Sequence, residues 1–344
     1  MIIKSSHIEQ SGGIDMSPDC PIDIVLPWVN GNDPAHKAKM RTYITSKKED
    51  TQPDVGGKER FCDMGEIRHC IASINRYAPF VRTIHIVTDG QDPNLEEYIR
   101  ALFPEGHIPM KIVSHEEIFK GYEQYLPTFN SRAIETMIWR IPGLSERFIL
   151  MNDDFFITSP LSPSDFFRGE ETICYASWYS TLLEKIVWAL KPRRSGHKKI
   201  SFKHSMVNAL DALGGGRRFI YLSHTPRALR RSFFEEYFGQ NEEMIIRNIQ
   251  HRFRHEDQYN SQELFYISEI RQGRCILVSP KGKALYIKPS KGHRHIERNI
   301  KAFGDGKGYM FGCINSLSGA SEADIEKVLD WFKTCVSCDG RPSE

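Results

Sequence analysis

The feature that most constrains this chain is an alternation of short apolar runs with amphipathic segments between residues 22 and 157. The apolar runs, several of them rich in β-branched residues, predict buried strands. They lie at residues 22–28, 81–88, 110–113 and 148–151. Residues 65–77 and 130–141 instead place apolar side chains at helical spacing. Strands that alternate with helices predict parallel βαβ units, so we expect a mostly parallel, Rossmann-like α/β sheet flanked by helices.

Acidic turns follow two of the predicted strands. Asp33 comes after the first strand, and Asp153 with Asp154 comes after the strand at 148–151. Ligands of parallel sheets bind beyond the carboxyl ends of the strands, where these acids would share one edge. Adjacent carboxylates suit Mg²⁺ or Mn²⁺, although an exposed acidic turn has the same sequence. We therefore predict that Asp153 and Asp154 take part in function and hold a divalent cation.

The two halves of the chain differ in charge. Residues 1–172 hold 18 Lys and Arg against 26 Asp and Glu, a net charge of −8, whereas residues 173–344 hold 28 against 18, a net of +10. This asymmetry favours a polyanionic ligand held by the second half, or else a solvated charged face. We expect a single catalytic domain over 1–344. Its parts are an α/β core at 20–160, a basic, partly helical insertion at 161–225, and a helical region at 226–334 that completes the site.

Two candidates for anion binding or proton transfer lie in the basic half. His224 precedes Thr225 and Pro226, which would cap and begin a helix within the mostly helical segment predicted over 226–272. A histidine beside a helix start suits anion binding or proton transfer. Arg254 offers a planar fork that suits phosphate. The simpler interpretations are a structural histidine for His224 and an exposed basic turn for Arg254.

Several function classes are excluded. The chain has no GxxxxGK[ST], GxGxxG, HExxH or GxSxG motif and no recognisable nucleic-acid module. No apolar run is long enough for a membrane span, and the start MIIKSSHIEQSGG lacks the apolar region of a secretory signal. Eight scattered cysteines indicate reduced thiols, so we expect a cytoplasmic protein. The pair Cys335 and Cys338 alone does not predict a zinc site.

Taken together, the motifs resemble those of the Stealth family. Three stretches are similar to its first two conserved regions: IDIVLPWVNGNDP (22–34), RFCDMGEIRHCIASINRYAPFVRTIHIVTDGQDP (60–93) and LPTFNSRAIETMIWRIPGLSERFILMNDDFFI (126–157). HTPRAL (224–229) with RFRHEDQYNSQ (252–262) resembles the third region, and GCINS (312–316) the fourth. The family includes bacterial capsular polysaccharide phosphotransferases and the animal GlcNAc-1-phosphotransferase. The resemblance implies a Rossmann-like or GT-A-like sheet with a basic, helical C-terminal half that closes one cleft.

The resemblance also implies a reaction and its residues. The chain would transfer a hexose or N-acetylhexosamine 1-phosphate from a UDP-sugar to a hydroxyl of a growing capsular polysaccharide, with UMP released. Catalytic residues would be Asp153, Asp154, His224 and Arg254, with the two acids as metal ligands. Substrate-binding residues would be Asn30, Asp33, Arg60, Asp63, Glu66, Arg68, Asn130, Asn152 and Asn315. Met64 and Ser316 depart from the family pattern, in which Asn and Asp are usual.

Rival functions remain open on the sequence alone. NDD after a strand also suits a metal-dependent glycosyltransferase that releases UDP, and a non-catalytic polysaccharide-binding or assembly protein would need no turnover. Either His224 or one of the two aspartates would be the general base. The expected partners are a UDP-sugar and a polysaccharide, without nucleic acid. The basic segment 191–203 indicates attachment to the inner face of the cytoplasmic membrane.

Overall fold

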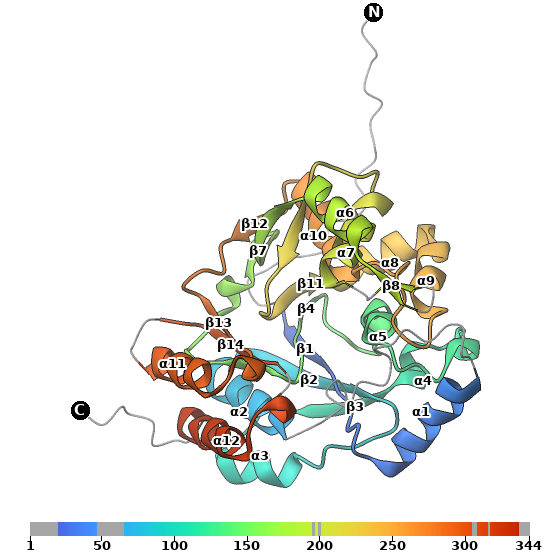
Figure 1. Cartoon of the computed structure of the whole chain (residues 1–344). Coiled ribbons are helices and arrows are strands. Elements are labelled where there is room, and N and C mark those ends of the chain that lie inside the picture. The colour runs from blue at the N-terminus through green and yellow to red at the C-terminus, as the bar shows by residue number, and fades with distance from the viewer. Residues whose placement is uncertain are drawn as a thin grey trace, which may run out of the picture.

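The computed structural model describes residues 20–46, 65–194, 197–198, 201–304, 308–315 and 317–336. Its centre is a five-stranded sheet in the order β11-β4-β1-β2-β3 (Figure 1). The strands are β1 (Ile22–Pro27), β2 (Val81–Thr88), β3 (Met110–Ser114), β4 (Arg147–Leu150) and β11 (Arg227–Arg230). β1 pairs parallel with β2 and β4, β2 pairs parallel with β3, and β11 pairs antiparallel with β4. The predicted α/β architecture with a mostly parallel sheet is therefore confirmed.

A buried carboxylate aligns the central strands. Asp23 lies in β1 with its side chain out of contact with solvent. Its Oδ1 accepts a hydrogen bond from Nε of Arg82 at 2.8 Å, and its Oδ2 accepts one from the backbone N–H of Ser145 at 2.8 Å. Burial alone would raise the pKa of Asp23, but hydrogen bonds from His85, Arg82 and Ser145 hold it well below its usual range. An ionised Asp23 thus ties β1 to β2 and to the segment before β4.

Helices cover both faces of this sheet. In the first half they are α1 (Pro34–Ser46), α2 (Glu66–Tyr77), α3 (Glu96–Leu102), α4 (His115–Ile118) and α5 (Ser131–Met137). Because side chains alternate along a strand, Ile24 of β1 joins the apolar cluster beneath α2, whereas Val25 joins the cluster beneath α5. The predicted helix at 130–141 is shorter than expected, since α5 passes into the 3₁₀ turn η3 (Ile138–Arg140).

Smaller sheets extend the fold from the second half of the chain. β5 (Phe155–Ile157), β13 (Ala284–Ile287) and β14 (Phe311–Ile314) form one sheet in the order β13-β14-β5. β7 (Glu171–Ser180), β10 (Arg218–Leu222) and β12 (Cys275–Val278) form another in the order β10-β7-β12, with β6 (Phe167–Arg168) on β7. β8 (Arg193–Arg194) and β9 (His197–Lys198) pair as a hairpin. The basic segment 191–203, predicted as a loop, thus contains a short hairpin and the first residues of a helix.

The remaining helices divide between two ends of the molecule. They are α6 (Thr181–Leu190), α7 (Phe202–Ala212), α8 (Arg231–Gln240), α9 (Glu242–Ile249), α10 (Ser261–Arg271), α11 (His293–Gly304) and α12 (Glu322–Val336). In Figure 1, α6 to α10 lie in the upper part of the view and α11 and α12 lie in the lower part beside α2. The ring of His69 in α2 stacks on Phe332 of α12 with centroids 4.7 Å apart, which joins the C-terminal helix to the core. No described helix has the length and apolar character that crossing a membrane requires.

The prediction of helix from residue 226 is wrong at its start. Residues 227–230 form β11, which pairs with β4 from Arg227 opposite Leu150 to Arg230 opposite Arg147. Thr225 and Pro226 therefore precede a strand, and α8 begins only at Arg231. The open edge of β4 offers backbone partners along its whole length, and this tertiary pairing outweighs the local helix signal. The three helices α8, α9 and α10 follow as expected.

Candidate active site

The acidic turn lies between two sheets. β4 ends at Leu150 and β5 begins at Phe155, so Asn152, Asp153 and Asp154 form the link between them. β5 pairs antiparallel with β14, with Cys313 opposite Phe155, and the N–H of Ile314 donates to the carbonyl of Asp154 at 3.0 Å. This pairing brings residues 312–315 against the acids, although they are far away in the sequence.

Asp154 is the most constrained of these acids. Its Oδ2 accepts hydrogen bonds from Nδ2 of Asn315 at 3.3 Å and from Sγ of Cys313 at 3.5 Å. Its Oδ1 is buried and has no hydrogen-bond partner among the described residues. Burial raises the pKa of Asp154, while Asn315, Cys313 and the charge of Arg227 oppose that rise. A carboxylate in this position needs a donor or a cation at Oδ1 to be stable in its charged form.

Two thiols border the same turn. Sγ of Cys70 in α2 donates to the carbonyl of Asn152 at 3.7 Å, so α2 supports the turn from beneath. Burial raises the pKa of Cys70 and of Cys313 well above the usual range, and the charges of Asp153 and Asp154 add to both shifts. Both thiols therefore stay protonated beside the acids and serve as packing and weak donors.

His224 lies in the turn between β10 and β11, on the same side as Asp154. Its ring stacks on Tyr286 of β13 at 4.4 Å between centroids, and meets Phe155 edge to face at 6.3 Å. Burial, with the charge of Arg227, lowers the pKa of His224 to about 4. The charge of Asp154 in turn acts on Tyr286, whose pKa burial raises to about 12. His224 is therefore neutral at physiological pH and close to the acidic turn.

Arg227 is a site residue that the sequence reasoning missed. It is the first residue of β11 and only 6% exposed, and its charge acts on both Asp154 and His224. Its Nη1 donates to Oε1 of Gln262 at 3.4 Å, whereas its Nε is buried without a hydrogen-bond partner among the described residues. Arg227 belongs to the motif HTPRAL, but this segment was expected to be helical, and nothing in the sequence indicated that its arginine would act on the acids.

Arg254 lies on a loop that Asn130 holds in place. Nη2 of Arg254 donates to Oγ of Ser131 at 2.7 Å. Asn130 is fully buried, caps α5 through its Oδ1, and donates from Nδ2 to the carbonyls of His251 at 2.8 Å and Phe253 at 2.9 Å. These contacts position the Arg254 loop, and the direct substrate contact that the resemblance implies for Asn130 stays a prediction.

Helix α5 lies between Arg254 and Arg227 in a series of side-chain contacts. Arg254 contacts Ser131 at the start of α5. Arg227 contacts Gln262, whose Nε2 donates at 2.9 Å to Oε2 of Glu135, one turn further along the same helix. The structure thus brings Asn315 directly to Asp154. His224 contacts Phe155, the residue after Asp154, and Arg254 contacts the start of α5.

Asn30 and Asp33 form a second group at the ends of β1 and β2. Gln91, after β2, accepts from the N–H of Asn30 at 2.9 Å and donates from Nε2 to Oδ2 of Asp33 at 2.8 Å. Hydrogen bonds from Gln91 and from the N–H of Ala35 lower the pKa of Asp33. Gln91 was not predicted, because a glutamine in a turn carries no signal for such a link.

Aromatic contacts connect the turn of Asn30 and Asp33 with the Arg254 loop. His36 of α1 meets Phe129 edge to face at 5.5 Å, and Phe129 stacks on Phe253 at 5.3 Å, next to Arg254. The strand-end turns and the Arg254 loop therefore border one region of the molecule.

The residues predicted at the start of α2 are placed differently. Arg60 and Asp63 lie outside the described residues. Glu66 is buried in the first turn of α2, whereas Arg68 is exposed and holds its guanidinium 5.8 Å from the ring of Tyr98 in α3. Arg68 thus faces the neighbouring helix α3.

The acidic turn fits a divalent cation. Asp153 and Asp154 offer the hard oxygen ligands that Mg²⁺ and Mn²⁺ prefer, and the buried Oδ1 of Asp154 has no described partner. A different cluster gathers His251, His255 and Asp257, whose ligand atoms all lie within 4.8 Å of one another. Imidazole ligands suit transition metals better than Mg²⁺, so this cluster does not take the place of the acidic turn.

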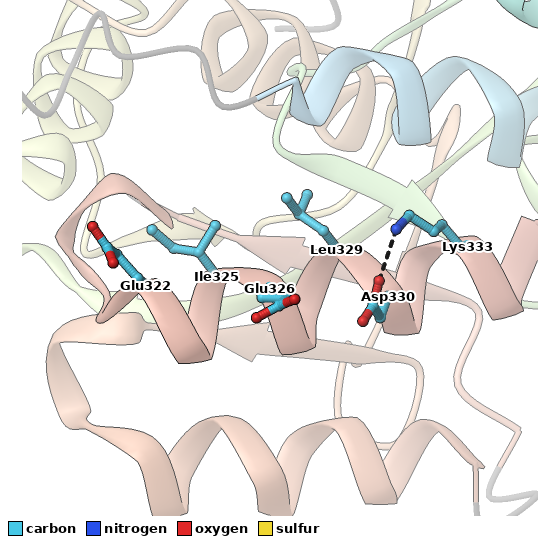
Figure 2. A pocket seen from close by; sticks show the side chains of 6 residues that line it. All are labelled: Glu322, Ile325, Glu326, Leu329, Asp330 and Lys333. Atoms are coloured by element: carbon cyan, nitrogen blue, oxygen red, sulfur yellow. Dashed lines mark hydrogen bonds and ion pairs between the residues drawn. The ribbon is translucent and has the colours of Figure 1, made fainter.

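A surface pocket lies elsewhere, on α12. It has a volume of about 300 Å³ and is lined by side chains of this one helix, among them Ile325, Leu329 and Lys333 (Figure 2). Lys333 pairs with Asp330 at 2.7 Å across its edge. None of the predicted site residues lines it, and its paired charges are those of a solvated helix face.

Comparisons with known proteins identify the sequence motifs. Residues 21–48 match the Stealth protein CR1, conserved region 1, and residues 60–175 match the Stealth protein CR2, conserved region 2. These regions contain Asn30, Asp33, Asn130, Asp153 and Asp154, which the first two groups of motifs had singled out.

Curated relatives extend beyond those two regions. The capsular polysaccharide phosphotransferase LcbA of Aeromonas hydrophila is 32% identical over 74% of this chain and 67% of its own length. The receptor polysaccharide phosphotransferase WefC of Streptococcus oralis is 28% identical over 90% of this chain and 94% of its own. An exopolysaccharide phosphotransferase of Streptomyces coelicolor is 31% identical over 68% of this chain, which spans only 37% of that relative.

Solved structures give a more distant likeness. The galactosyltransferase LgtC, in complex with donor and acceptor sugar analogs, aligns with 94% of this chain and 98% of its own at 10% identity and a TM-score of 0.44. This likeness is too distant to bear on function. The matches to LcbA and to both conserved regions show that the chain belongs to the Stealth family of phosphotransferases.

Proposed function

We propose that this protein transfers a hexose or N-acetylhexosamine 1-phosphate from a UDP-sugar to a hydroxyl of a polysaccharide, forming a phosphodiester and releasing UMP. The observation that carries the proposal is Asp154, whose buried Oδ1 has no hydrogen-bond partner among the described residues. The charge of the buried Arg227 acts on Asp154 and on the neutral His224. The names of the relatives, which are capsular, receptor and exopolysaccharide phosphotransferases, support the same class of acceptor.

The proposed reaction is an in-line substitution at the β-phosphorus. The acceptor oxygen forms a new P–O bond, and the bond between that phosphorus and the oxygen bridging to UMP breaks. The bond between the sugar and its phosphate survives, and the hydroxyl proton passes to a base of the protein. Enzymes accelerate such transfers mainly by positioning the reactants and by neutralising charge.

His224 is suited to accept that proton. Because its pKa is lowered to about 4, it is neutral before substrate binds and can act as a base. The negative diphosphate of a donor would raise this pKa, since a nearby opposite charge favours the imidazolium form. Its basicity would therefore increase when the substrate is in place. Asp154 is the alternative base, and burial likewise raises its pKa.

Arg227 and Arg254 are proposed to balance the phosphate charge. Arg227 is buried with Nε unpartnered among the described residues, so a phosphate oxygen would complete its hydrogen bonding. Arg254 is fixed through one nitrogen to Ser131, and the planar guanidinium keeps its other donors in a defined orientation. Both cations come from the basic half of the chain.

Asp153 and Asp154 would hold Mg²⁺ or Mn²⁺. A cation there would neutralise charge on the diphosphate of the donor. The side chain of Asn315 would keep Asp154 oriented, because its amide already donates to Oδ2. We assign Asn30 and Asp33, linked by Gln91, to the nucleotide-sugar pocket, and we leave Arg68 outside it because it faces Tyr98.

The cytoplasm is the compartment that we propose for the reaction. Cys70, Cys174 and Cys313 are buried free thiols in the described structure. Reduced cysteines of this kind are usual in the cytosol, where disulfides are rare.

Phosphorus NMR of the reaction mixture tests this function. We expect a new phosphodiester resonance together with UMP when the protein is given a UDP-sugar, an oligosaccharide acceptor and Mg²⁺, across a panel of UDP-sugars. Release of UDP with a new glycoside would instead identify a glycosyltransferase. Binding of the saccharide without nucleotide release, unchanged in Asp153→Ala with Asp154→Ala, would identify a non-catalytic binding protein.

A further inference from the structure

Helix α6 exposes its apolar side chains and buries its acid. The exposed set, called the α6 face below, consists of Leu182, Leu183, Ile186, Val187 and Leu190. Leu190 is 79% exposed, whereas Glu184 is 8% exposed and accepts from Oγ of Ser201 at 3.4 Å. A helix on the surface of a globular protein normally has the opposite arrangement. A contiguous apolar surface of this kind marks a site of interaction.

Aromatic side chains border the α6 face. Trp178 and Tyr179, at the end of β7 just before the helix, are 42% and 39% exposed. Trp188 lies within α6 and stacks on His204 of α7 at 3.8 Å. Tyrosine and tryptophan have an apolar ring and a polar group, and they gather where an apolar phase meets water.

Cations surround these rings. Nζ of Lys191 lies 5.1 Å from the ring centroid of Trp188, and Nζ of Lys203 lies 4.4 Å from that of Tyr179. The sequence that follows the helix, KPRRSGHKK over 191–199, has five Lys and Arg and no acid. Lys191, Lys203 and the basic sequence 191–199 are called the basic flank below.

We propose that the α6 face, with its basic flank, docks in the plane of an anionic phospholipid bilayer. Exposed leucines would enter the acyl boundary, the aromatic rim would lie at the headgroups, and the basic flank would meet the anionic lipids. A second copy of this chain is a poorer occupant, because the two basic flanks would repel one another.

The docking face is joined to the candidate active site. β10 begins beside α6, where Arg218 is opposite Ser180, and ends at the turn that carries His224. At the start of α7, the ring of Phe202 lies 6.0 Å from the guanidinium of Arg227. In Figure 1, α6 is on the outer surface at the top of the view, above β10's neighbour β7. The inference concerns where the enzyme works, and so goes beyond the reaction that it catalyses.

Vesicle flotation of the full chain tests the proposal. We expect binding to phosphatidylcholine vesicles that contain phosphatidylglycerol, weaker binding at high salt, and little binding to phosphatidylcholine alone. The variant Leu183→Gln with Leu190→Gln should weaken binding by at least ~100-fold, because the transfer of two leucine side chains from water into the bilayer is lost. Ile112→Gln is the matched control, because Ile112 is 43% exposed on β3, away from this face, and its variant should bind as the wild type does.

The basic flank has its own variants. Arg193→Gln and Arg194→Gln should each weaken binding by about fivefold and reduce its salt dependence. Leu183 and Leu190 are 64% and 79% exposed, so the melting temperature of the leucine variant should stay within a degree or two of the wild type's, which shows that it folds. The melting temperatures of the arginine variants are recorded in the same way.

Three outcomes would overturn the proposal. They are an absence of vesicle binding, leucine variants that bind as well as the wild type, and a wild-type dimer that these variants convert to monomer. UMP release with a water-soluble acceptor and without vesicles should be unchanged in the leucine variants. A failure of vesicle binding is therefore distinguishable from a failure of the proposed chemistry.

Discussion

The candidate active site has two walls that are built in different ways. The acidic wall is the turn of Asp153 and Asp154, held between β4 and β5 and bonded to Cys313 and Asn315. The basic wall consists of His224, Arg227 and Arg254, which lie in a turn, at a strand start and in a loop. The first is fixed by backbone pairing of a sheet, and the second by ring stacking and by contacts with α5.

This difference indicates how the walls divide the work. The carboxylate of Asp154, with a raised pKa and one oxygen that has no partner in the described part of the chain, is prepared for a cation or a proton. A neutral histidine beside a buried arginine is prepared for an anion. We propose that the charge asymmetry between the halves of the chain, −8 and +10, has a local counterpart in these two walls.

Removal of the base from the basic wall gives the largest expected effect. His224→Ala should lower the turnover number by roughly 10²–10⁴, the usual contribution of a general base, with the fold intact. The measurement is UMP release under saturating substrate, with the melting temperature recorded in parallel. His107→Gln, at a histidine paired with Glu96 on the surface of α3, is the control and should keep full activity.

Near wild-type turnover in His224→Ala would transfer the base role to the acidic wall. Partial recovery of the variant by added imidazole would instead confirm that proton transfer is what the ring supplies.

Removal of the charge of Asp154 from the acidic wall gives the second-largest expected effect. Asp154→Asn keeps the shape of the side chain but removes its charge, and should lower turnover roughly 10²–10³-fold through lost electrostatic stabilisation. Raising the Mg²⁺ concentration should recover part of the loss, because the variant binds the cation more weakly. Asp330→Asn on the exposed face of α12 is the matched control. Full activity of Asp154→Asn at ordinary Mg²⁺ would remove the acidic wall from the mechanism.

The acidic wall could be predicted from sequence because its strands obey simple periodicity. The runs at 22–28, 81–88 and 148–151 became β1, β2 and β4, and acids placed after parallel strands must share an edge. Local patterns were sufficient for the parallel strands of this sheet, whose apolar runs are continuous. The motif resemblance added Asn315, which the pairing of β14 with β5 places against Asp154.

The basic wall could not be built in the same way. β11 forms at the edge of β4, so its identity depends on a partner about 80 residues earlier, and the local signal favoured helix. Arg227 and Gln91 were missed because single polar residues acquire a role only through long-range contacts. The exposed leucines of α6 were not singled out either, since a periodic pattern does not say which face of a helix meets water.

A milder change tests how rigidly the basic wall must be held. Arg254→Lys keeps the charge but loses the planar fork, and should lower kcat/KM by about 10- to 100-fold, the value of one hydrogen bond to a charged group. Asn130→Ala should give a similar loss by releasing the loop, and should also lower the melting temperature because Asn130 caps α5. Arg100→Lys, an exposed arginine of α3 paired with Glu96, is the control. If Arg254→Lys matches the control, Arg254 does not contact the substrate.

The pH profile gives the smallest effect and compares the two walls in one measurement. Activity of the free enzyme needs Asp154 ionised and His224 neutral, and both conditions are lost as the pH falls. His224, with a pKa of about 4, gains its proton only in acid, and Asp154, whose pKa burial raises, gains one at a higher pH than an ordinary aspartate. The acid limb of log kcat/KM against pH should therefore approach a slope of two, since two protons inactivate the enzyme.

The variant His224→Gln separates the two groups. Its acid limb should have a slope of one, due to Asp154 alone. The charges that face these groups are those of Arg227 and Asp153, with the thiol of Cys313, and none of them is altered in the variant. An unchanged slope in His224→Gln would mean that protonation of His224 does not contribute to the acid limb, which would then be set by the acidic wall alone.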